Sequence, residues 1–181
     1  MMDRIAERIR MGQEDAKMLA AIDQASLDAL AQAIVDAKRI YVAGWGRAGN
    51  CVKILGMNCS QMGLTAHICG DNTTPSIHEG DLLVVGSGSG ETKTIALLAQ
   101  QAKEHGAKLA LISRNANSTI GKIADINVEI PGVEKPEGAP AGTGGSFYHV
   151  MVQTVDMVRG YVCEIIGVTS ADMHYNHNNL E

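Results

Sequence analysis

The feature that most constrains this chain is the stretch at residues 81–105, DLLVVGSGSGETKTIALLAQQAKEH. It begins with an uninterrupted apolar run at residues 82–85, which is typical of a strand covered on both faces. Glycines alternating with serines then turn the chain, and residues 91–105 are rich in helix formers with apolar side chains at helical spacing. The order strand, small polar loop and helix predicts one unit of a parallel α/β sheet.

The loop of this unit is suited to an anion. A helix begins with backbone N–H groups that lack partners and with the positive end of its dipole. Ser87, Ser89 and Thr92 place three hydroxyl groups within about one helical turn of that point. The loop lacks the lysine and the spacing of a nucleotide P-loop, and its glycines do not match the dinucleotide fingerprint. We predict a monophosphate site, and a capped turn without a ligand is the alternative.

A second unit of the same kind precedes it, with a strand at residues 39–43, a glycine-rich loop and a helix at about 50–62. Gly44-x-Gly46-x-x-Gly49 formally matches the dinucleotide fingerprint, which also requires an acidic residue about twenty positions later. Asp71 is the candidate, but it follows the next strand, so nucleotide binding is the weaker interpretation. Arg47 is either a phosphate or sugar ligand or a surface arginine with a solvated head group.

The remaining elements complete an alternation of strands and helices. We expect one or two helices over 3–37, with a break at Gly12 and another that Ser26 caps. Further strands are expected at 64–69, 107–113 and 126–130, with a short helix at 118–124 and a long helix from Ser146 to about 166. This pattern predicts a three-layer α/β sandwich with a five-stranded parallel sheet. The loops that contain Arg47, Ser87 and Ser113 then meet at its carboxyl edge.

Composition excludes several classes of protein. The 181 residues favour a single compact domain, and the net charge of −5 without a basic run argues against a nucleic-acid partner. No apolar run approaches about 20 residues, so we expect no membrane span, and the charged N-terminus is unlike a signal peptide. Four cysteines without CxxC spacing indicate the reduced thiols of a cytoplasmic protein. His174 and His177 lack a third ligand, so no metal site is expected.

The Pro/Gly-rich segment at 133–145 is interpreted as a lid, a crossing between subunits or a plain surface loop.

Several segments resemble a known family. YVAGWGRAGN, DLLVVGSGSGETKT, LALISRNANSTIGKIAD and VEIPG occur in the order found in a SIS domain, the phosphosugar-binding fold of sugar isomerases. The single-domain length, the exit Ile130-Pro131-Gly132 and the tail His177-Asn178-Asn179-Leu180-Glu181 resemble the 6-phospho-3-hexuloisomerase family in particular. The resemblance covers residues 39–181, after an N-terminal helical segment at 1–38. It implies the flavodoxin-like strand order and a homo-oligomer, a tetramer or dimer, with sites at subunit interfaces.

The resemblance also implies an activity, the conversion of 3-hexulose 6-phosphate to fructose 6-phosphate without a metal or an organic cofactor. By position, the serines and threonine of the second loop and its backbone hold the phosphate, and the first loop lines the sugar. The candidate substrate- and phosphate-binding residues are Gly46, Arg47, Ser87, Gly88, Ser89, Gly90, Thr92 and Ser113.

Two positions depart from the family pattern. Ala48 stands where the family commonly has a serine, and His149 stands where it usually has a glutamate. An enediol mechanism requires a base, and histidine suits this role near neutral pH. Our hypothesis is that His149 or His177 is the base, while Arg47 or a loop amide polarises the carbonyl. The alternative for each histidine is a solvated or core side chain.

Other candidate bases are less suitable. Glu91 lies in a first helical turn, where a carboxylate has a stabilising role. His78 and Glu79 precede the central strand and are expected at the opposite edge of the sheet. The alternative functions are a different aldose–ketose phosphosugar isomerase and a non-catalytic phosphosugar sensor, which the two departures favour.

Overall fold

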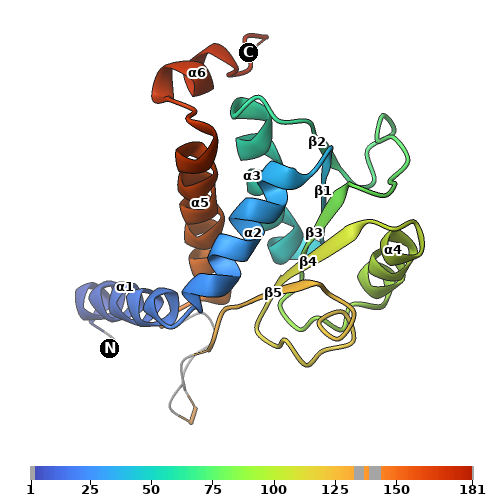
Figure 1. Cartoon of the computed structure of the whole chain (residues 1–181). Coiled ribbons are helices and arrows are strands. Elements are labelled where there is room, and N and C mark those ends of the chain that lie inside the picture. The colour runs from blue at the N-terminus through green and yellow to red at the C-terminus, as the bar shows by residue number, and fades with distance from the viewer. Residues whose placement is uncertain (1–2, 133–136, 139–143, 181) are drawn as a thin grey trace.

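Five parallel strands form the middle layer of the fold, as the computed structural model in Figure 1 shows for residues 3–132, 137–138 and 144–180. They are β1 (Ile40–Ala43), β2 (Ala66–Ile68), β3 (Leu82–Gly86), β4 (Lys108–Ser113) and β5 (Ile126–Glu129). Their order in the sheet is β2-β1-β3-β4-β5. This is the flavodoxin-like order, so the predicted fold class is confirmed.

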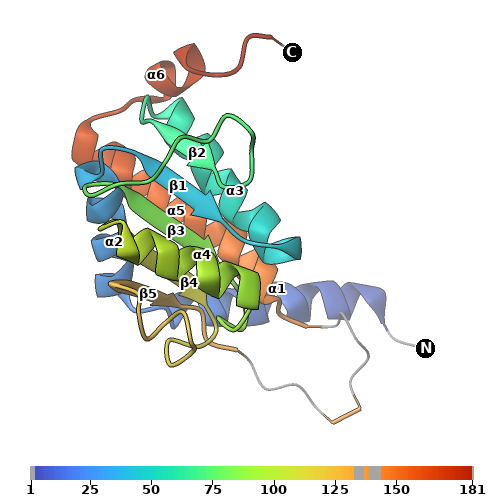
Figure 2. The same ribbon diagram turned by 90° about the vertical axis from the view of Figure 1, so that its right-hand side faces the viewer.

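Helices cover both faces of the sheet unequally. They are α1 (Arg4–Ala20), α2 (Gln24–Asp36), α3 (Gly46–Gln61), α4 (Lys93–Glu104), α5 (Phe147–Ile166) and α6 (Ser170–Tyr175). The helices α2, α3 and α5 pack on one face, and α4 covers the other (Figures 1 and 2). The strands are parallel, so each one starts at the amino edge of the sheet and ends at its carboxyl edge. The loops after β1, β3 and β4 therefore lie together at the carboxyl edge.

The two cores explain why β3 is apolar throughout. Leu82 and Val84 contribute to the core beneath α2, α3 and α5. Leu83 and Val85 point the other way and contribute to the core beneath α4. All four side chains are fully buried, because a strand in the middle of a parallel sheet is covered on both faces.

The N-terminal region differs from the prediction in where it breaks. Helix α1 continues through Gly12, so the predicted break there is wrong. The break lies at residues 21–23, and Asp23 rather than Ser26 caps α2, since its carboxylate accepts from the Ser26 N–H at 2.9 Å. Helix α2 buries Leu27, Leu30 and Ile34 in the main core, whereas α1 projects beside α5 (Figure 1).

Other element boundaries also differ from the predicted ones. Helix α3 begins at Gly46 rather than near 50, and β2 is shorter than predicted. The helix predicted at 118–124 is wrong, because these residues form successive turns. The Ser118 hydroxyl accepts from the Gly121 N–H at 3.1 Å, and the Asn127 side-chain amide binds the Gly121 carbonyl at 3.0 Å. The segment at 133–145, interpreted as a lid or crossing, lies mostly outside the described residues.

Among the described helices, none is long and apolar enough by itself to cross a membrane; α1 and α2 pass that test only as a pair bent by 74°. The described residues contain no cluster of three or more histidine, cysteine, aspartate or glutamate side chains suited to a metal ion.

Candidate active site

A cavity of about 690 Å³ opens at the carboxyl edge of the sheet. The loop after β1, the loop after β3, the loop after β4 and the first turn of α5 surround it. Its lining consists of Trp45, Gly46, Arg47, Ala48, Gly86, Ser87, Gly88, Ser89, Glu91, Thr92, Arg114, Asn115 and Tyr148. Ligands bind at this edge in open α/β sheets, so this cavity is the candidate site.

The first loop is held tightly by close backbone contacts. A Cβ atom on Gly49 would lie 2.3 Å from the Gly44 carbonyl oxygen, and one on Gly44 would lie 2.6 Å from the Gly86 carbonyl oxygen. These two glycines are therefore required for packing α3 against β1 and β3. The match to the dinucleotide fingerprint is explained without a nucleotide, and Asp71 is not part of the cavity lining.

The second loop offers hydrogen-bond donors to the cavity. The Ser87 hydroxyl accepts from the Gly90 N–H at 3.2 Å and lies 3.4 Å from the Thr92 hydroxyl. Gly90 has a φ of 68°, which favours glycine. In the described chain, the N–H groups of Gly88, Ser89 and Thr92 donate to no protein acceptor. Together with the start of α4, these donors form an arrangement that is suited to an anion, and we call it the anion cradle.

Two arginines face the same cavity from other loops. The Arg47 guanidinium lies 4.0 Å from the centre of the Tyr148 ring, and that of Arg114 lies 5.0 Å from the centre of the Phe147 ring. Neither pairs with a carboxylate among the residues described here. Aromatic rings orient a guanidinium without neutralising it, so both positive charges are available to an anionic ligand.

A second cavity of about 540 Å³ adjoins the first and shares Arg47, Arg114 and Tyr148 with it. His149 lines this second cavity, and its side chain is 52% exposed. Its Nδ1 lies 3.1 Å from Oδ2 of Asp15 on α1. The predicted base candidate His149 is therefore next to the cavity rather than inside its main lining.

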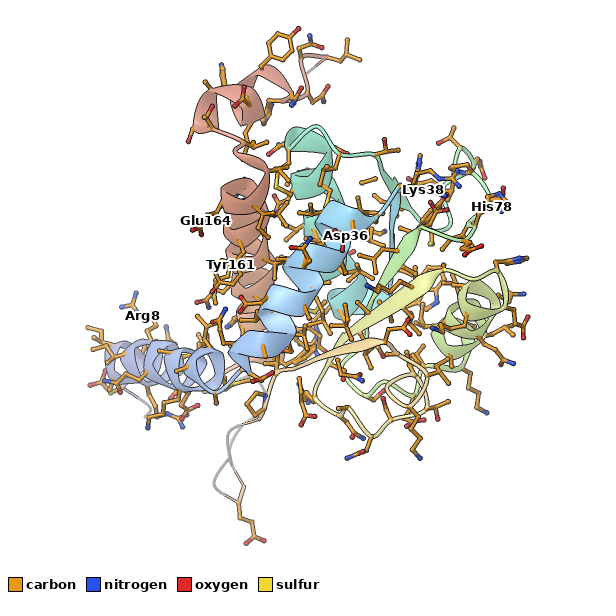
Figure 3. The ribbon with its side chains drawn as sticks, in the orientation of Figure 1. Arg8, Asp36, Lys38, His78, Tyr161 and Glu164 are labelled. Atoms are coloured by element: carbon orange, nitrogen blue, oxygen red, sulfur yellow. The ribbon has the colours of Figure 1, made fainter. Side chains whose placement is uncertain are left out.

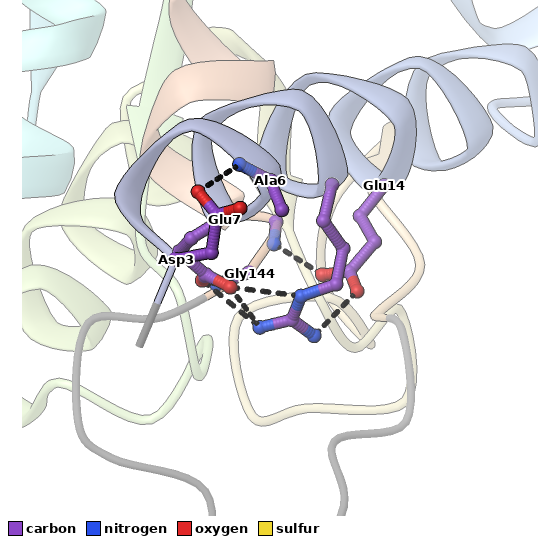
Figure 4. Close-up of polar contacts among 7 residues, drawn as sticks. Asp3, Ala6, Glu7, Glu14 and Gly144 are labelled. Atoms are coloured by element: carbon purple, nitrogen blue, oxygen red, sulfur yellow. Dashed lines mark hydrogen bonds and ion pairs between the residues drawn. The ribbon is translucent and has the colours of Figure 1, made fainter. Parts of the chain in front are cut away.

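Three carboxylates of helix α1 bind the segment of chain that leads into α5. Glu7 accepts from the Gly144 N–H at 2.8 Å, and Glu14 accepts from the Gly145 N–H at 2.5 Å (Figure 4). Arg10 lies between these two glutamates, with nitrogen–oxygen distances of 2.8 and 3.0 Å. Hydrogen bonding to Glu7 raises the pKa of Arg10.

The third carboxylate is that of Asp15, which accepts from the Ser146 N–H at 2.7 Å. Successive backbone N–H groups at 144–146 are thus each bound by α1. These contacts fix the first turn of α5, which carries Tyr148 and His149 to the cavities.

The structure brings most of the predicted binding residues together. Gly46, Arg47, Ser87, Gly88, Ser89 and Thr92 all line the larger cavity. Gly90 lies behind them in the turn. Ser113 is 1% exposed, and its hydroxyl accepts from the Asn115 N–H at 3.1 Å, so it shapes the loop after β4 rather than lining the cavity.

His177 lies elsewhere in the same chain. It follows α6, which packs against the far end of α3, where the Asn176 amide donates to the Gln61 carbonyl at 3.1 Å. The 20 residues of α5 separate this end from Tyr148, a length of about 30 Å at 1.5 Å per residue. A role for His177 at this cavity therefore requires a second copy of the chain.

Glu91 and His78, the less suitable candidates for the base, make contacts within the fold. Glu91 lies on the rim and accepts from the N–H and the hydroxyl of Thr119 at 2.8 and 2.6 Å, and these hydrogen bonds lower the pKa of Glu91. His78 lies near Lys38 at the amino edge of the sheet, as expected (Figure 3).

Sequence reasoning did not place Trp45, Arg114, Asn115 and Tyr148 in the site. Arg114 carried a usable signal, because it directly follows β4 at the carboxyl edge, as Arg47 follows β1. Tyr148 carried none, since its contact with Arg47 joins residues far apart in the sequence.

Comparisons with known proteins agree with this architecture. The family model described as SIS domain matches residues 33–155. A "3-hexulose-6-phosphate isomerase" of Mycobacterium gastri is 35% identical, covering 93% of this chain and 86% of that protein. A protein of the same name from Bacillus subtilis (strain 168) is 36% identical, covering 90% of each. A solved structure from Methanococcus jannaschii, whose description infers a function of 3-hexulose-6-phosphate isomerase, has a TM-score of 0.85 and 26% identity, covering 97% of this chain and 99% of that one.

Proposed function

The chain belongs to the SIS domain family, and from this premise we propose that it is a phosphosugar isomerase that interconverts 3-hexulose 6-phosphate and fructose 6-phosphate. The observation that carries the proposal is the cavity of about 690 Å³ between a hydroxyl-rich anion cradle and two unneutralised arginines. The chain also matches most of the length of two relatives whose names state this activity.

The two loops divide the substrate between them. The phosphate binds at the start of α4, where Ser87, Ser89 and Thr92 supply hydroxyl groups and Gly88 supplies a backbone N–H. Arg47 reaches the sugar from the opposite loop and polarises the carbonyl. Arg114 joins the site from the loop after β4 and adds a second positive charge. In this proposal, the reacting carbons lie between the phosphate and the start of α5.

The reaction moves a carbonyl group between adjacent carbons. A base removes the proton from C2, and the electrons shift onto O3 to give an enediolate. The proton of O2 passes to O3, and the base returns its proton to C3, which leaves the carbonyl at C2. His149 is the base that the geometry of one chain supports, because it lines the adjoining cavity.

The proposal includes an assembly and a location. The chain acts as a homo-oligomer, a tetramer or dimer, in which the partner subunit's His177 reaches the cavity and moves the hydroxyl proton. It acts in the cytoplasm, which is supported by the absence of disulfides among its four cysteines. Burial raises the pKa of the Cys59 thiol to about 12, so this thiol is unreactive.

The test is turnover of 3-hexulose 6-phosphate, followed by enzymatically coupled detection of fructose 6-phosphate. We expect robust turnover without added metal, and a loss in kcat of about 10²-fold or more in His149→Ala. Unchanged kcat in His149→Ala would overturn its assignment as the base. No turnover in the wild type, together with thermal stabilisation by a sugar phosphate, would indicate a phosphosugar-binding protein instead.

A matched experiment addresses His177. Mixing His149→Ala with His177→Ala subunits, after dissociation and reassembly, restores activity if each site combines residues from two copies of the chain. Turnover equal to that of the separate variants would contradict a shared site.

A further inference from the structure

Asp15 on α1 makes a contact that the isomerisation proposed above does not yet use. The residue is 8% exposed although most of its helix faces solvent. Oδ1 accepts from the Ser146 N–H at 2.7 Å, and Oδ2 lies 3.1 Å from Nδ1 of His149. In the part of the chain that the structure describes, no lysine or arginine pairs with this carboxylate. Both oxygens of Asp15 are therefore directed at the first turn of α5.

The chemistry of this contact determines where the ring of His149 carries its proton. A carboxylate only accepts hydrogen bonds, so Nδ1 of His149 must be the donor. In the neutral imidazole, Nε2 then holds the lone pair. Nε2 makes no hydrogen bond to any described residue, and the side chain lies in the cavity that adjoins the larger one through Arg47 and Arg114. This is the protonation state that a general base requires.

We propose that Asp15 is a positioning residue for the base: it holds His149 in the Nδ1–H tautomer and stabilises the imidazolium formed when Nε2 takes the substrate proton. The inference rests on the proposed function. The proton leaves C2, resides on Nε2 and returns to C3, while Asp15 stays ionised throughout. A histidine on α5 thus acts with a carboxylate supplied by the N-terminal helix.

Asp15→Asn separates this role from simple anchoring of α5. The asparagine oxygen still accepts from the Ser146 N–H, while its NH₂ group turns toward Nδ1 of His149 and favours the opposite tautomer. We expect kcat to fall about 10²-fold with KM changed by less than about threefold. Asp15→Glu, which restores a carboxylate, should recover at least about tenfold of the lost kcat. Asp28→Asn, which removes one negative charge from the exposed face of α2, should keep kcat within about twofold.

Two further measurements make the result decisive. In the double variant Asp15→Asn/His149→Ala, kcat should equal that of His149→Ala within about twofold, because positioning an absent ring has no effect. Side-chain ¹⁵N NMR of the imidazole, assigned by comparison with His149→Ala, should show the Nδ1–H tautomer in the wild type and the Nε2–H tautomer in Asp15→Asn.

Wild-type kcat in Asp15→Asn, or losses that multiply in the double variant, would overturn the proposal. Absence of turnover in the wild type would instead overturn the proposed function. The NMR measurement would still decide the inference then, since an unchanged tautomer in Asp15→Asn would contradict it without any activity.

Discussion

Arg39 and Arg47 lie at the two ends of β1 and meet opposite partners. At the amino edge, the Arg39 guanidinium donates two hydrogen bonds to the Asp81 carboxylate, at 3.1 and 2.8 Å. That carboxylate is 1% exposed and also accepts from the His78 N–H at 2.8 Å. At the carboxyl edge, Arg47 rests on the ring of Tyr148 instead.

The difference in partners indicates a difference in use. A bidentate contact with a buried carboxylate neutralises Arg39 and ties β1 to β3, so its charge is used for folding. An aromatic ring holds Arg47 in place but leaves its charge and its N–H donors available. The same residue type, on either side of β1, thus has its charge neutralised at one edge and available to a ligand at the other.

Removal of the carboxylate at the amino edge is expected to have the largest effect. Asp81→Ala leaves the partly buried Arg39 unpaired and the His78 N–H without its acceptor, so the free energy of unfolding should fall by about 3 kcal/mol. Urea unfolding measures this, and kcat/KM of the folded fraction should stay within about twofold. The control is Arg159→Ala, which breaks an exposed ion pair of 3.6 Å and should cost less than about 0.5 kcal/mol. Equal losses in the two variants would remove the distinction between the edges.

The reverse result is expected for Arg47→Ala. Loss of a charged donor to the substrate should lower kcat/KM by about 10²-fold, while the free energy of unfolding changes by less than about 1 kcal/mol. Arg47→Lys keeps the charge without the planar guanidinium, so its kcat/KM should lie between those of the wild type and Arg47→Ala. Steady-state kinetics and urea unfolding of the same preparations provide the check. A large loss of stability with unchanged kinetics would place Arg47 in the same class as Arg39.

These contrasts also show what the sequence reveals. The apolar run of β3 and the alternation of strands with helices were sufficient for the fold, since a doubly covered sheet demands both. The short helix predicted at 118–124 is absent, and these turns contact Asn127 through the carbonyl of Gly121, a partner that a local pattern does not contain. The division into segments 1–38 and 39–181 stays a prediction.

The site was predictable only where residues follow strands. Arg47 and the loop from Ser87 to Thr92 were found this way, because the carboxyl ends of parallel strands lie at one edge. The partners of these residues were not predictable. Asp15 and His149 are separated by 134 positions, so only the packing of α1 on α5 reveals their contact.

A smaller effect is expected when the cavity gains a hydroxyl group. Ala48 lines the cavity beside Arg47 and stands where the family commonly has a serine. Ala48→Ser should tighten binding of fructose 6-phosphate by about threefold to fivefold, the value of about one hydrogen bond. Trp45, the single tryptophan, lines the cavity and is 60% exposed, so its fluorescence reports the titration. The control Ala96→Ser on α4 lies outside the lining, and an equal gain there would contradict a specific contact.

The smallest expected effect concerns Glu91, the carboxylate on the rim of the cavity. Hydrogen bonds from Thr119 hold its pKa below the ordinary value of 4.5, so ionised Glu91 favours the folded state above that pH. The contribution is lost as the pH falls through the lowered pKa. Glu91→Gln should therefore lower the Tm by at most about 3 °C at pH 7, and by less at acidic pH.

Differential scanning calorimetry across this range tests the partner of Glu91. Thr119→Val should remove most of the difference between wild type and Glu91→Gln, because it deletes the hydroxyl donor at 2.6 Å. If Arg47→Ala removes the difference instead, Glu91 neutralises Arg47 in solution. The carboxyl edge would then resemble the amino edge, and the available positive charge of the cavity would be that of Arg114 alone among the arginines that line it.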